Sequence, residues 1–317
     1  MKKNSFWENN APYLLIPAIM FLALIFVFEP TWITLTLAGL AMGMIYFMMS
    51  SGLSIVFGLM DVLNLAHVGF ITVGAFIAGS LVGRMYDWSL VEAFLPNVAV
   101  VLIASLGGAL IALVTGYLVE RLLIRPVYGN HLEQILITMG GLIVIEEIVV
   151  MIWGSDPVMV ERPSFFQGSL LFGDVVVEKY RIFCVVIGLI IYLALRYVLK
   201  KTRIGLLIRA GVENREMVEA LGYKINFLFT GVFVIGSALA GLGGVLFAFY
   251  EEMILVSIGQ ENLIVVFIVV IIGGLGSITG SFLGALLVGL VGVYVGFFFP
   301  VLKVGANLLL MIAILEI

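Results

Sequence analysis

Long apolar runs alternate with short polar intervals along the whole chain. Runs that approach the length of a membrane-crossing helix, about 20 residues, occupy 13–28, 33–57, 98–118, 135–153, 182–199 and 227–250. A polar interruption at 58–70 precedes a glycine-rich run that ends at Gly83, and the last run, 263–315, is interrupted at 273–280 and at Pro300. The pattern predicts one all-α membrane domain over 1–317, with about eight to ten transmembrane helices, some broken or re-entrant.

Composition agrees with a polytopic membrane protein. Only 11% of the residues are charged and 63% are hydrophobic, whereas soluble domains contain about 25% charged residues. The single cysteine, Cys184, excludes a disulfide framework and a cysteine metal site. We therefore expect neither a metal nor a cofactor. The first apolar run has no cleavage pattern after it, so we interpret it as a retained span.

The segment 200–222 is the longest charge-rich interval in the chain. Its apolar residues recur at helical spacing, with Arg209, Glu213 and Glu219 among the polar positions between them. Asn214 is a plausible N-cap and Gly222 a plausible stop, because glycine adopts a left-handed conformation at little cost. We expect one or two amphipathic helices outside the bilayer. They form either a solvated loop or a docking element for a soluble partner.

Basic residues predict the orientation of the chain, since lysine and arginine accumulate in cytoplasmic loops. If the N-terminus is cytoplasmic, eleven of the sixteen lysine and arginine residues fall on the cytoplasmic side. This places the segment 200–225 in the cytoplasm and the loop 154–181 outside. Glu251, Glu252 and Glu261 also fall outside, where they could contact an extracytoplasmic partner.

Three polar residues interrupt the apolar pattern after the second span. Asp61, Asn64 and His67 recur at spacings of three residues, which places them near one face of a helix. Polar groups at membrane depth must face a cavity, pair within the protein or lie near an interface. One interpretation is a broken segment beside a translocation path, and the other is a set of hydrogen bonds that locks helix packing.

Two further features are candidates for the path. Gly273, Gly274, Gly276 and Ser277 belong to a stretch with four glycines in eight residues, which interrupts a helix and allows close backbone approach. Close packing of helices alone also explains it. Glu147 stands beside Glu146 in the fifth span, where it either binds the polar end of a substrate or simply reaches an interface.

The sequence lacks the motifs that mark several classes of enzyme. The sequence contains no GxxxxGK[ST] phosphate loop, no HExxH pattern and no Gly-x-Ser-x-Gly elbow. We therefore expect no catalytic site and no ATPase site in this chain, and no nucleic-acid partner.

The motifs together resemble a known family. Gly52-Leu53-Ser54-Ile55-Val56-Phe57-Gly58, Asn64-Leu65-Ala66-His67, Arg125-Pro126, Glu219-Ala220-Leu221-Gly222 and the 273–280 stretch are similar to the permeases of branched-chain amino acid ABC transporters, in particular the leucine/isoleucine/valine H-type subunit. The resemblance covers roughly 39–290. One departure is Val68-Gly69, where the family has Gly-Glu, and another is the pair Glu146-Glu147, where amides are common.

The resemblance implies a permease subunit of a type II-like ABC importer in a prokaryotic inner membrane. Such a subunit works with a second permease chain, two ATP-binding-cassette chains, an extracytoplasmic solute-binding protein and the surrounding lipid. It implies that 200–225 is the coupling segment, with Arg209, Glu213, Glu219 and Gly222 contacting the ATPase. Asn64, His67, Glu147 and the 273–280 stretch would then line or shape the path.

Other functions remain open at this point. A stand-alone channel or an ion-coupled transporter also uses paired broken helices, and the finding of a bound ATPase chain would discriminate. A sugar, urea or amide permease of similar fold differs in the ligand of its binding protein. An intramembrane enzyme is remote, because no nucleophile or acid/base pair is recognisable.

Overall fold

Most of the chain is helical in the computed structural model, which describes residues 5–213 and 215–316. The helices are α1 (Ser5–Phe26), α2 (Glu29–Met60), α3 (His67–Arg84), α4 (Tyr86–Leu90), α5 (Phe94–Val119), α6 (His131–Trp153), α7 (Ser164–Gln167), α8 (Lys179–Lys201), α9 (Arg203–Glu213), α10 (Arg215–Ala220), α11 (Ile225–Glu251), α12 (Ile258–Gly273), α13 (Ile278–Phe298) and α14 (Lys303–Leu315). Short turns are the π-helical η1 (Glu120–Ile124) and the 3-10 turns η2 (Arg125–Val127) and η3 (Pro300–Leu302). The strands are β1 (Val158–Met159), β2 (Ser169–Phe172), β3 (Val175–Glu178) and β4 (Met253–Ile254).

The apolar runs of the sequence correspond to these helices. Within the described residues, seven helices are long and apolar enough to cross a membrane, and three shorter apolar helices accompany them. The prediction of an all-α polytopic membrane protein is confirmed. The short helices α12 and α14 account for the broken appearance of the last apolar run. Helix α12 ends at Gly273, where the predicted interruption 273–280 begins, and α14 begins at Lys303, shortly after Pro300.

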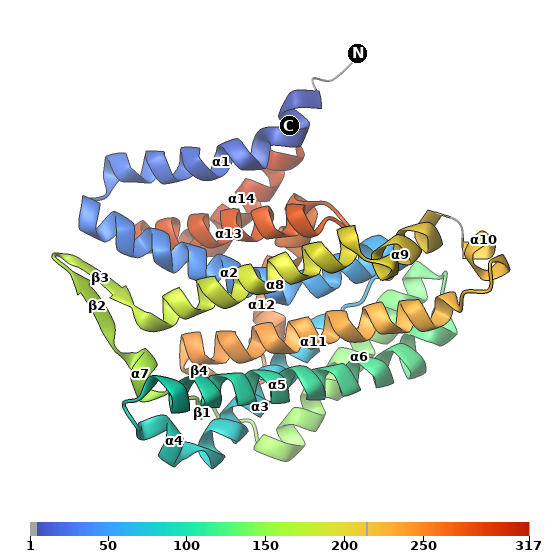
Figure 1. Ribbon diagram of the computed structural model, residues 1–317, viewed down its shortest axis with the longest axis horizontal. Coiled ribbons are helices and arrows are strands. Elements are labelled where there is room, and N and C mark those ends of the chain that lie inside the picture. The colour runs from blue at the N-terminus through green and yellow to red at the C-terminus, as the bar shows by residue number, and fades with distance from the viewer. Residues whose placement is uncertain (1–4, 214, 317) are drawn as a thin grey trace.

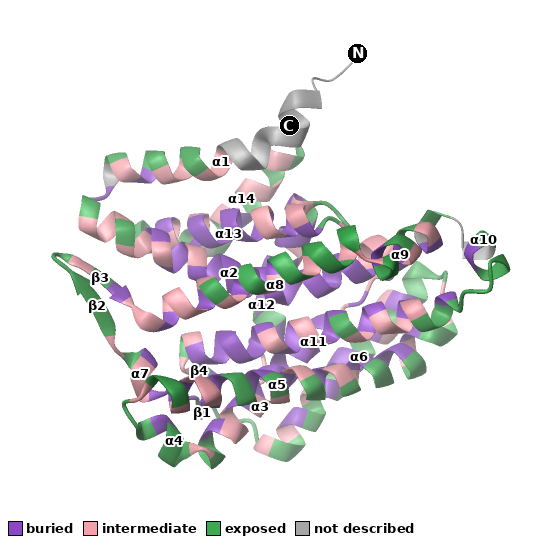
Figure 2. Cartoon of the chain, viewed as in Figure 1, coloured by how far each residue is buried: buried purple, intermediate pink, exposed green. Residues whose placement is uncertain are grey.

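The centre of the bundle is α11, which packs against α2, α3 and α5. Glycines permit the short distances: a Cβ atom on Gly74 of α3 would lie 2.0 Å from the carbonyl oxygen of Gly241 in α11. Figure 2 shows buried residues concentrated in α2, α11 and α13, while α5 and α8 carry many exposed ones. The exposed residues of these outer helices are largely apolar, as expected for surfaces that face lipid or another membrane chain.

Short connecting elements gather at two opposite ends of the bundle (Figure 1). At one end, here called the hairpin end, lie α4, α7 and the antiparallel pair β2–β3, in which Leu170 pairs with Val177. At the other end, here called the α9 end, lie α9 and α10. The predicted loop 154–181 thus has secondary structure of its own, and β1 pairs with β4 through Val158 and Ile254.

Candidate substrate path and coupling site

The charge-rich segment forms two short helices, α9 and α10, where the sequence predicts one or two amphipathic helices. Ile208 and Val218 are buried, whereas Arg209, Glu213 and Glu219 are exposed. Gly205 allows α9 to fold back on the last turn of α8, since a Cβ atom there would lie 2.1 Å from the carbonyl oxygen of Leu199. Arg209 donates a hydrogen bond to the same carbonyl. The predicted N-cap, Asn214, lies outside the described residues.

Gly222 ends α10 in the manner predicted. Its φ is +87°, its N–H donates to the carbonyl of Glu219 at 2.9 Å, and the N–H of Tyr223 donates to Val218 at 3.2 Å. This pair of bonds is the Schellman arrangement, which requires a left-handed residue and therefore favours glycine. The chain can in this way reverse from α10 into α11 within a few residues.

The glycine-rich stretch forms a tight turn between α12 and α13. Gly274 and Gly276 have φ values of +76° and +79°, and the Ser277 hydroxyl caps α13 by accepting from Gly280 N–H at 3.0 Å. The turn lies against α2, where Gly276 N–H donates to the carbonyl of Ser54 at 3.1 Å. A Cβ atom on Gly58 would lie 2.1 Å from the Cα of Gly276, so α2 and the turn are in backbone contact.

A cavity of about 500 Å³ joins this turn to the start of α9. Its lining includes Arg196, Lys200 and Arg209 on one side, and Gly276 and Ser277 on the other. Two groups of residues predicted separately from the sequence therefore meet at the α9 end. Residues of α9 and of the 274–277 turn therefore face the same cavity.

The second broken segment lies between α2 and α3, and one detail of the prediction is wrong. Asp61, Asn64 and His67 do not share a helix face, because α2 ends at Met60 and Asp61 adopts a left-handed conformation with φ +53°. The helical spacing was coincidental, since 61–66 is non-helical. Asp61 is exposed and pairs with His131 at 3.3 Å.

Side chains of α6 bind the backbone of this segment. Leu63 N–H donates to Oε1 of Gln134 at 3.3 Å, and Leu65 N–H donates to the hydroxyl of Thr138 at 3.2 Å. Gln134 and Thr138 are buried. Irregular backbone at membrane depth needs such partners, because lipid offers none.

His67 fixes the start of α3 against α2. Its side chain is 1% exposed, and Nε2 donates to the carbonyl of Met49 at 2.8 Å. Met49 lies well inside α2, eleven residues before its end. This contact is consistent with the packing interpretation of His67, which stays a prediction.

Asn64 differs from His67 in its bonding. Its side chain is 1% exposed, yet neither its Oδ1 nor its Nδ2 has a partner among the described residues. A buried amide without hydrogen bonds costs about 1–3 kcal/mol. Each such group in a native structure needs an explanation, such as a functional role, an ordered water or an ion.

Glu147 lies apart from these residues. Its side chain is exposed on α6, beside the exposed apolar residues Val144 and Ile148. The neighbouring Glu146 is half-buried and accepts a hydrogen bond from Gln260 at 2.6 Å. The structure therefore does not bring Glu147 together with Asn64, His67 or the 274–277 turn.

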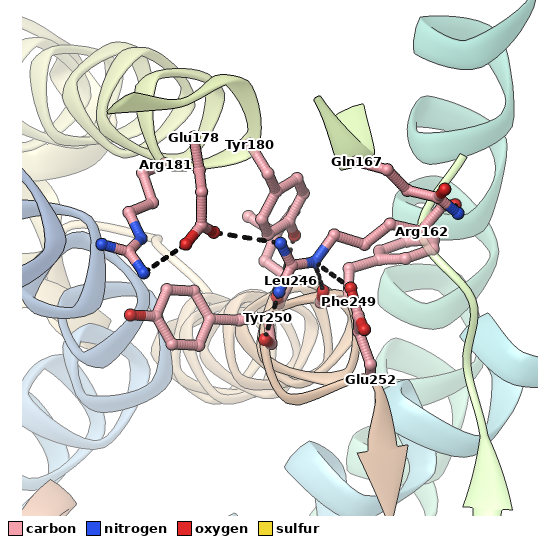
Figure 3. A network of polar contacts seen from close by, with 9 residues as sticks. All are labelled: Arg162, Gln167, Glu178, Tyr180, Arg181, Leu246, Phe249, Tyr250 and Glu252. Atoms are coloured by element: carbon pink, nitrogen blue, oxygen red, sulfur yellow. Dashed lines mark hydrogen bonds and ion pairs between the residues drawn. The ribbon is translucent and has the colours of Figure 1, made fainter. Parts of the chain in front are cut away.

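An arginine-centred network at the hairpin end was not predicted (Figure 3). Arg162 donates to the carbonyls of Phe249 at 2.6 Å and Tyr250 at 2.8 Å, the last turn of α11. It also pairs with Glu252 at 2.7 Å and with Glu178 at 3.1 Å. The cation neutralises the negative end of the α11 dipole and holds the loop 154–181 on the bundle. Nothing in the sequence distinguishes Arg162 from other loop arginines.

Sequence reasoning also missed a cavity of about 300 Å³ at the hairpin end. Residues of α2, α11, α12 and α14 line it, and they include Tyr46, Glu251, Glu261, Asn262 and Asn307. These residues are spread over more than 250 positions of the chain. No local motif connects them.

Similarity to known proteins extends over most of the chain. A family model described as the permease component of the branched-chain amino acid transport system matches residues 35–315. The high-affinity branched-chain amino acid transport system permease protein BraD of Pseudomonas aeruginosa is 30% identical, over 79% of this chain and 82% of its own. LivH of Salmonella typhimurium is 26% identical over 79% of this chain and 82% of its own. A probable LivH of Methanocaldococcus jannaschii is 27% identical over 77% of this chain and 74% of its own. No solved structure matches the chain.

Proposed function

This chain belongs to the family of branched-chain amino acid transport permeases, and from that premise we propose that it is one membrane subunit of an ATP-driven importer for a branched-chain amino acid or a related small polar solute. The proposal rests on one structural observation above all. The two amphipathic helices α9 and α10 project a charged face from one end of a bundle of spanning helices. The chain has no phosphate loop of its own, so the energy comes from partner chains.

Coupling to the ATPase uses α9 and α10. Arg209, Glu213 and Glu219 offer charges of both signs to a partner surface, and such pairs favour orientation and specificity of docking. Gly222 sets the angle between α10 and α11. Arg209 of α9 and Ser277 of the glycine-rich turn line one cavity, so a partner that moves α9 changes the space beside the turn.

The solute path runs beside the two broken segments. Asn64 offers a buried amide with both polar atoms unpaired among the described residues, and Gly273, Gly274, Gly276 and Ser277 form the turn that meets α2. His67 shapes the path by fixing α3. Glu147, which is exposed on α6, acts at most where a neighbouring chain covers that face.

The proposed assembly contains a second permease chain, two ATPase chains and an extracytoplasmic binding protein in the prokaryotic inner membrane. The α9 end faces the cytoplasm, as does the N-terminus. In support, Arg121, Arg125 and Lys224 line one cavity with Glu219 and Gly222. These basic residues therefore gather at the α9 end, as cytoplasmic basic residues do.

Purification of the tagged chain from its native membrane in mild detergent tests this proposal. We expect a second permease and P-loop ATPase chains to co-purify, with ATP turnover that the loaded binding protein stimulates. Emergence of the chain alone or as a homo-oligomer without ATPase activity would overturn the proposal, and a stand-alone channel or ion-coupled transporter would replace it.

A further inference from the structure

The cavity at the hairpin end is lined by carboxylate and amide side chains together with apolar ones. Its floor is formed by Tyr46, which is 4% exposed in the middle of α2, and its walls include Glu251, Glu261, Asn262 and Asn307. A volume of about 300 Å³ is at the small end of the range for small-molecule sites. The cavity therefore suits a compact solute.

Two carboxylates give the cavity a negative charge. Glu251 and Glu252 are neighbours at the end of α11, but only Glu252 is paired with Arg162. Glu251 forms no salt bridge within the part of the chain that the structure describes. Glu261 accepts a hydrogen bond from the Ser257 hydroxyl at 2.6 Å, which leaves its charge unneutralised. No cation is among the described residues that line the cavity.

Two buried amides add acceptor atoms. Asn307 is 1% exposed, and its Oδ1 has no partner among the residues described. Asn262 is 6% exposed, and its Nδ2 is already bonded to the carbonyl of Ile258 at 2.8 Å. One of its two N–H groups is thereby used, and its carbonyl oxygen can accept a hydrogen bond from a ligand. A primary ammonium, with three N–H donors and a positive charge, matches this set of acceptors.

The remaining lining is apolar and includes Phe247, Ile258 and Val265. A metal ion is a poor match, because no cluster of three or more histidine, cysteine or acidic residues occurs among the described residues. In a molecule that joins an ammonium group to an aliphatic side chain, the ammonium group would contact the polar acceptors, and the aliphatic side chain would contact the apolar part of the lining.

We infer that this cavity binds the ammonium end of a small aliphatic amino acid on its way through the permease. The inference rests on the proposed import function and adds a recognition site at the hairpin end. Glu251 supplies the charge, Asn307 supplies a buried acceptor, and Phe247 and Val265 contact the aliphatic part.

Protection of an introduced cysteine tests the inference in the assembled complex. Val304 lines the cavity and is 48% exposed, whereas the native Cys184 is buried. A Val304→Cys variant would therefore react selectively with a membrane-impermeant maleimide. The probes are leucine, 3-methylbutylamine, which lacks the carboxylate, 4-methylpentanoate, which lacks the amine, and sodium chloride.

We expect leucine and 3-methylbutylamine to slow labelling and 4-methylpentanoate to have no effect. A second change, Glu251→Gln, should raise the protecting concentration roughly tenfold or more, as for the loss of a charge-assisted hydrogen bond. Asp87→Asn is the matched control, because Asp87 is an exposed carboxylate of α4, also at the hairpin end, outside the cavity. It should leave protection unchanged.

Equal protection by 4-methylpentanoate, or protection by sodium alone, would overturn ammonium recognition. So would the absence of any protection in a complex that imports leucine with ATP, and the proposed function would then survive. A complex that shows no ATP-driven import of leucine, but retains protection by the two amines, would refute the proposed function and leave the ammonium site in place.

Discussion

The contact between α2 and the 274–277 turn makes a sharp prediction for Gly58→Ala. The added methyl carbon would lie 2.1 Å from the Cα and 2.2 Å from the nitrogen of Gly276. Carbon atoms prefer separations of about 3.5–4.0 Å, so α2 and the turn must separate by roughly 1.5 Å. The three nearest atoms are backbone atoms of Leu275 and Gly276, which cannot move aside as a flexible side chain does.

The expected cost follows from a matched comparison. Replacement of a helical glycine by alanine contributes up to about 1 kcal/mol of stability through helix propensity, while overpacking costs typically about 1–3 kcal/mol. Gly140→Ala in α6 provides the control, because a Cβ atom there has no neighbour within 4 Å. The propensity contribution is common to both variants, so their difference isolates the packing cost of about 1–3 kcal/mol.

Thermal unfolding of the purified chain in detergent, followed by tryptophan fluorescence, measures this difference. Gly58→Ala should melt several degrees below Gly140→Ala, and in the assembled complex it should also lower solute uptake. Equal melting temperatures for the two variants would show that α2 and the 274–277 turn are not in backbone contact. The proposal that this turn meets α2 beside the solute path would then be wrong.

Three further predictions concern residues at both ends and in the middle of the bundle. Glu219→Arg or Gly222→Pro should abolish substrate-stimulated ATP turnover while leaving membrane insertion intact. Full stimulation would refute their coupling role. Arg162→Ala should cost on the order of 2 kcal/mol and speed proteolysis of the loop 154–181, and unchanged cleavage would contradict the network of Figure 3. His67→Ala should lower the free energy of unfolding by about 2–4 kcal/mol through loss of a buried hydrogen bond and of volume, and so lower the melting temperature, and His67→Gln should lower both less. An unchanged melting temperature in His67→Ala would exclude the packing role.

The features that the sequence predicts well depend on local physics. Spans follow from the length of apolar runs, as in α5 and α11. The stop at Gly222 and the break at 273–280 follow from the backbone freedom of glycine. The amphipathic α9 follows from helical spacing, because its buried residue Ile208 and exposed residue Arg209 occupy different faces.

The features that it does not predict depend on distant pairing. The spacing of Asp61, Asn64 and His67 mimics a helix face, but polar partners from α6 stabilise an irregular segment there instead. Likewise, nothing local shows that Gly58 meets Gly276, or that Glu251 remains unpaired while Glu252 binds Arg162. The exposure of Glu147 depends on which face of α6 meets the bundle.

The hydrogen bonds from Leu63 and Leu65 to α6 also constrain how the protein is made. Their acceptors, Gln134 and Thr138, follow 71 and 73 residues later in the chain. At a synthesis rate of about 5–20 residues per second, the irregular segment is made roughly 4–15 s before its partners. During that interval the backbone N–H groups of Leu63 and Leu65 lack the acceptors that they have in the folded chain. The connection between α2 and α3 therefore gains its last two hydrogen bonds only after the first turns of α6 have been synthesised.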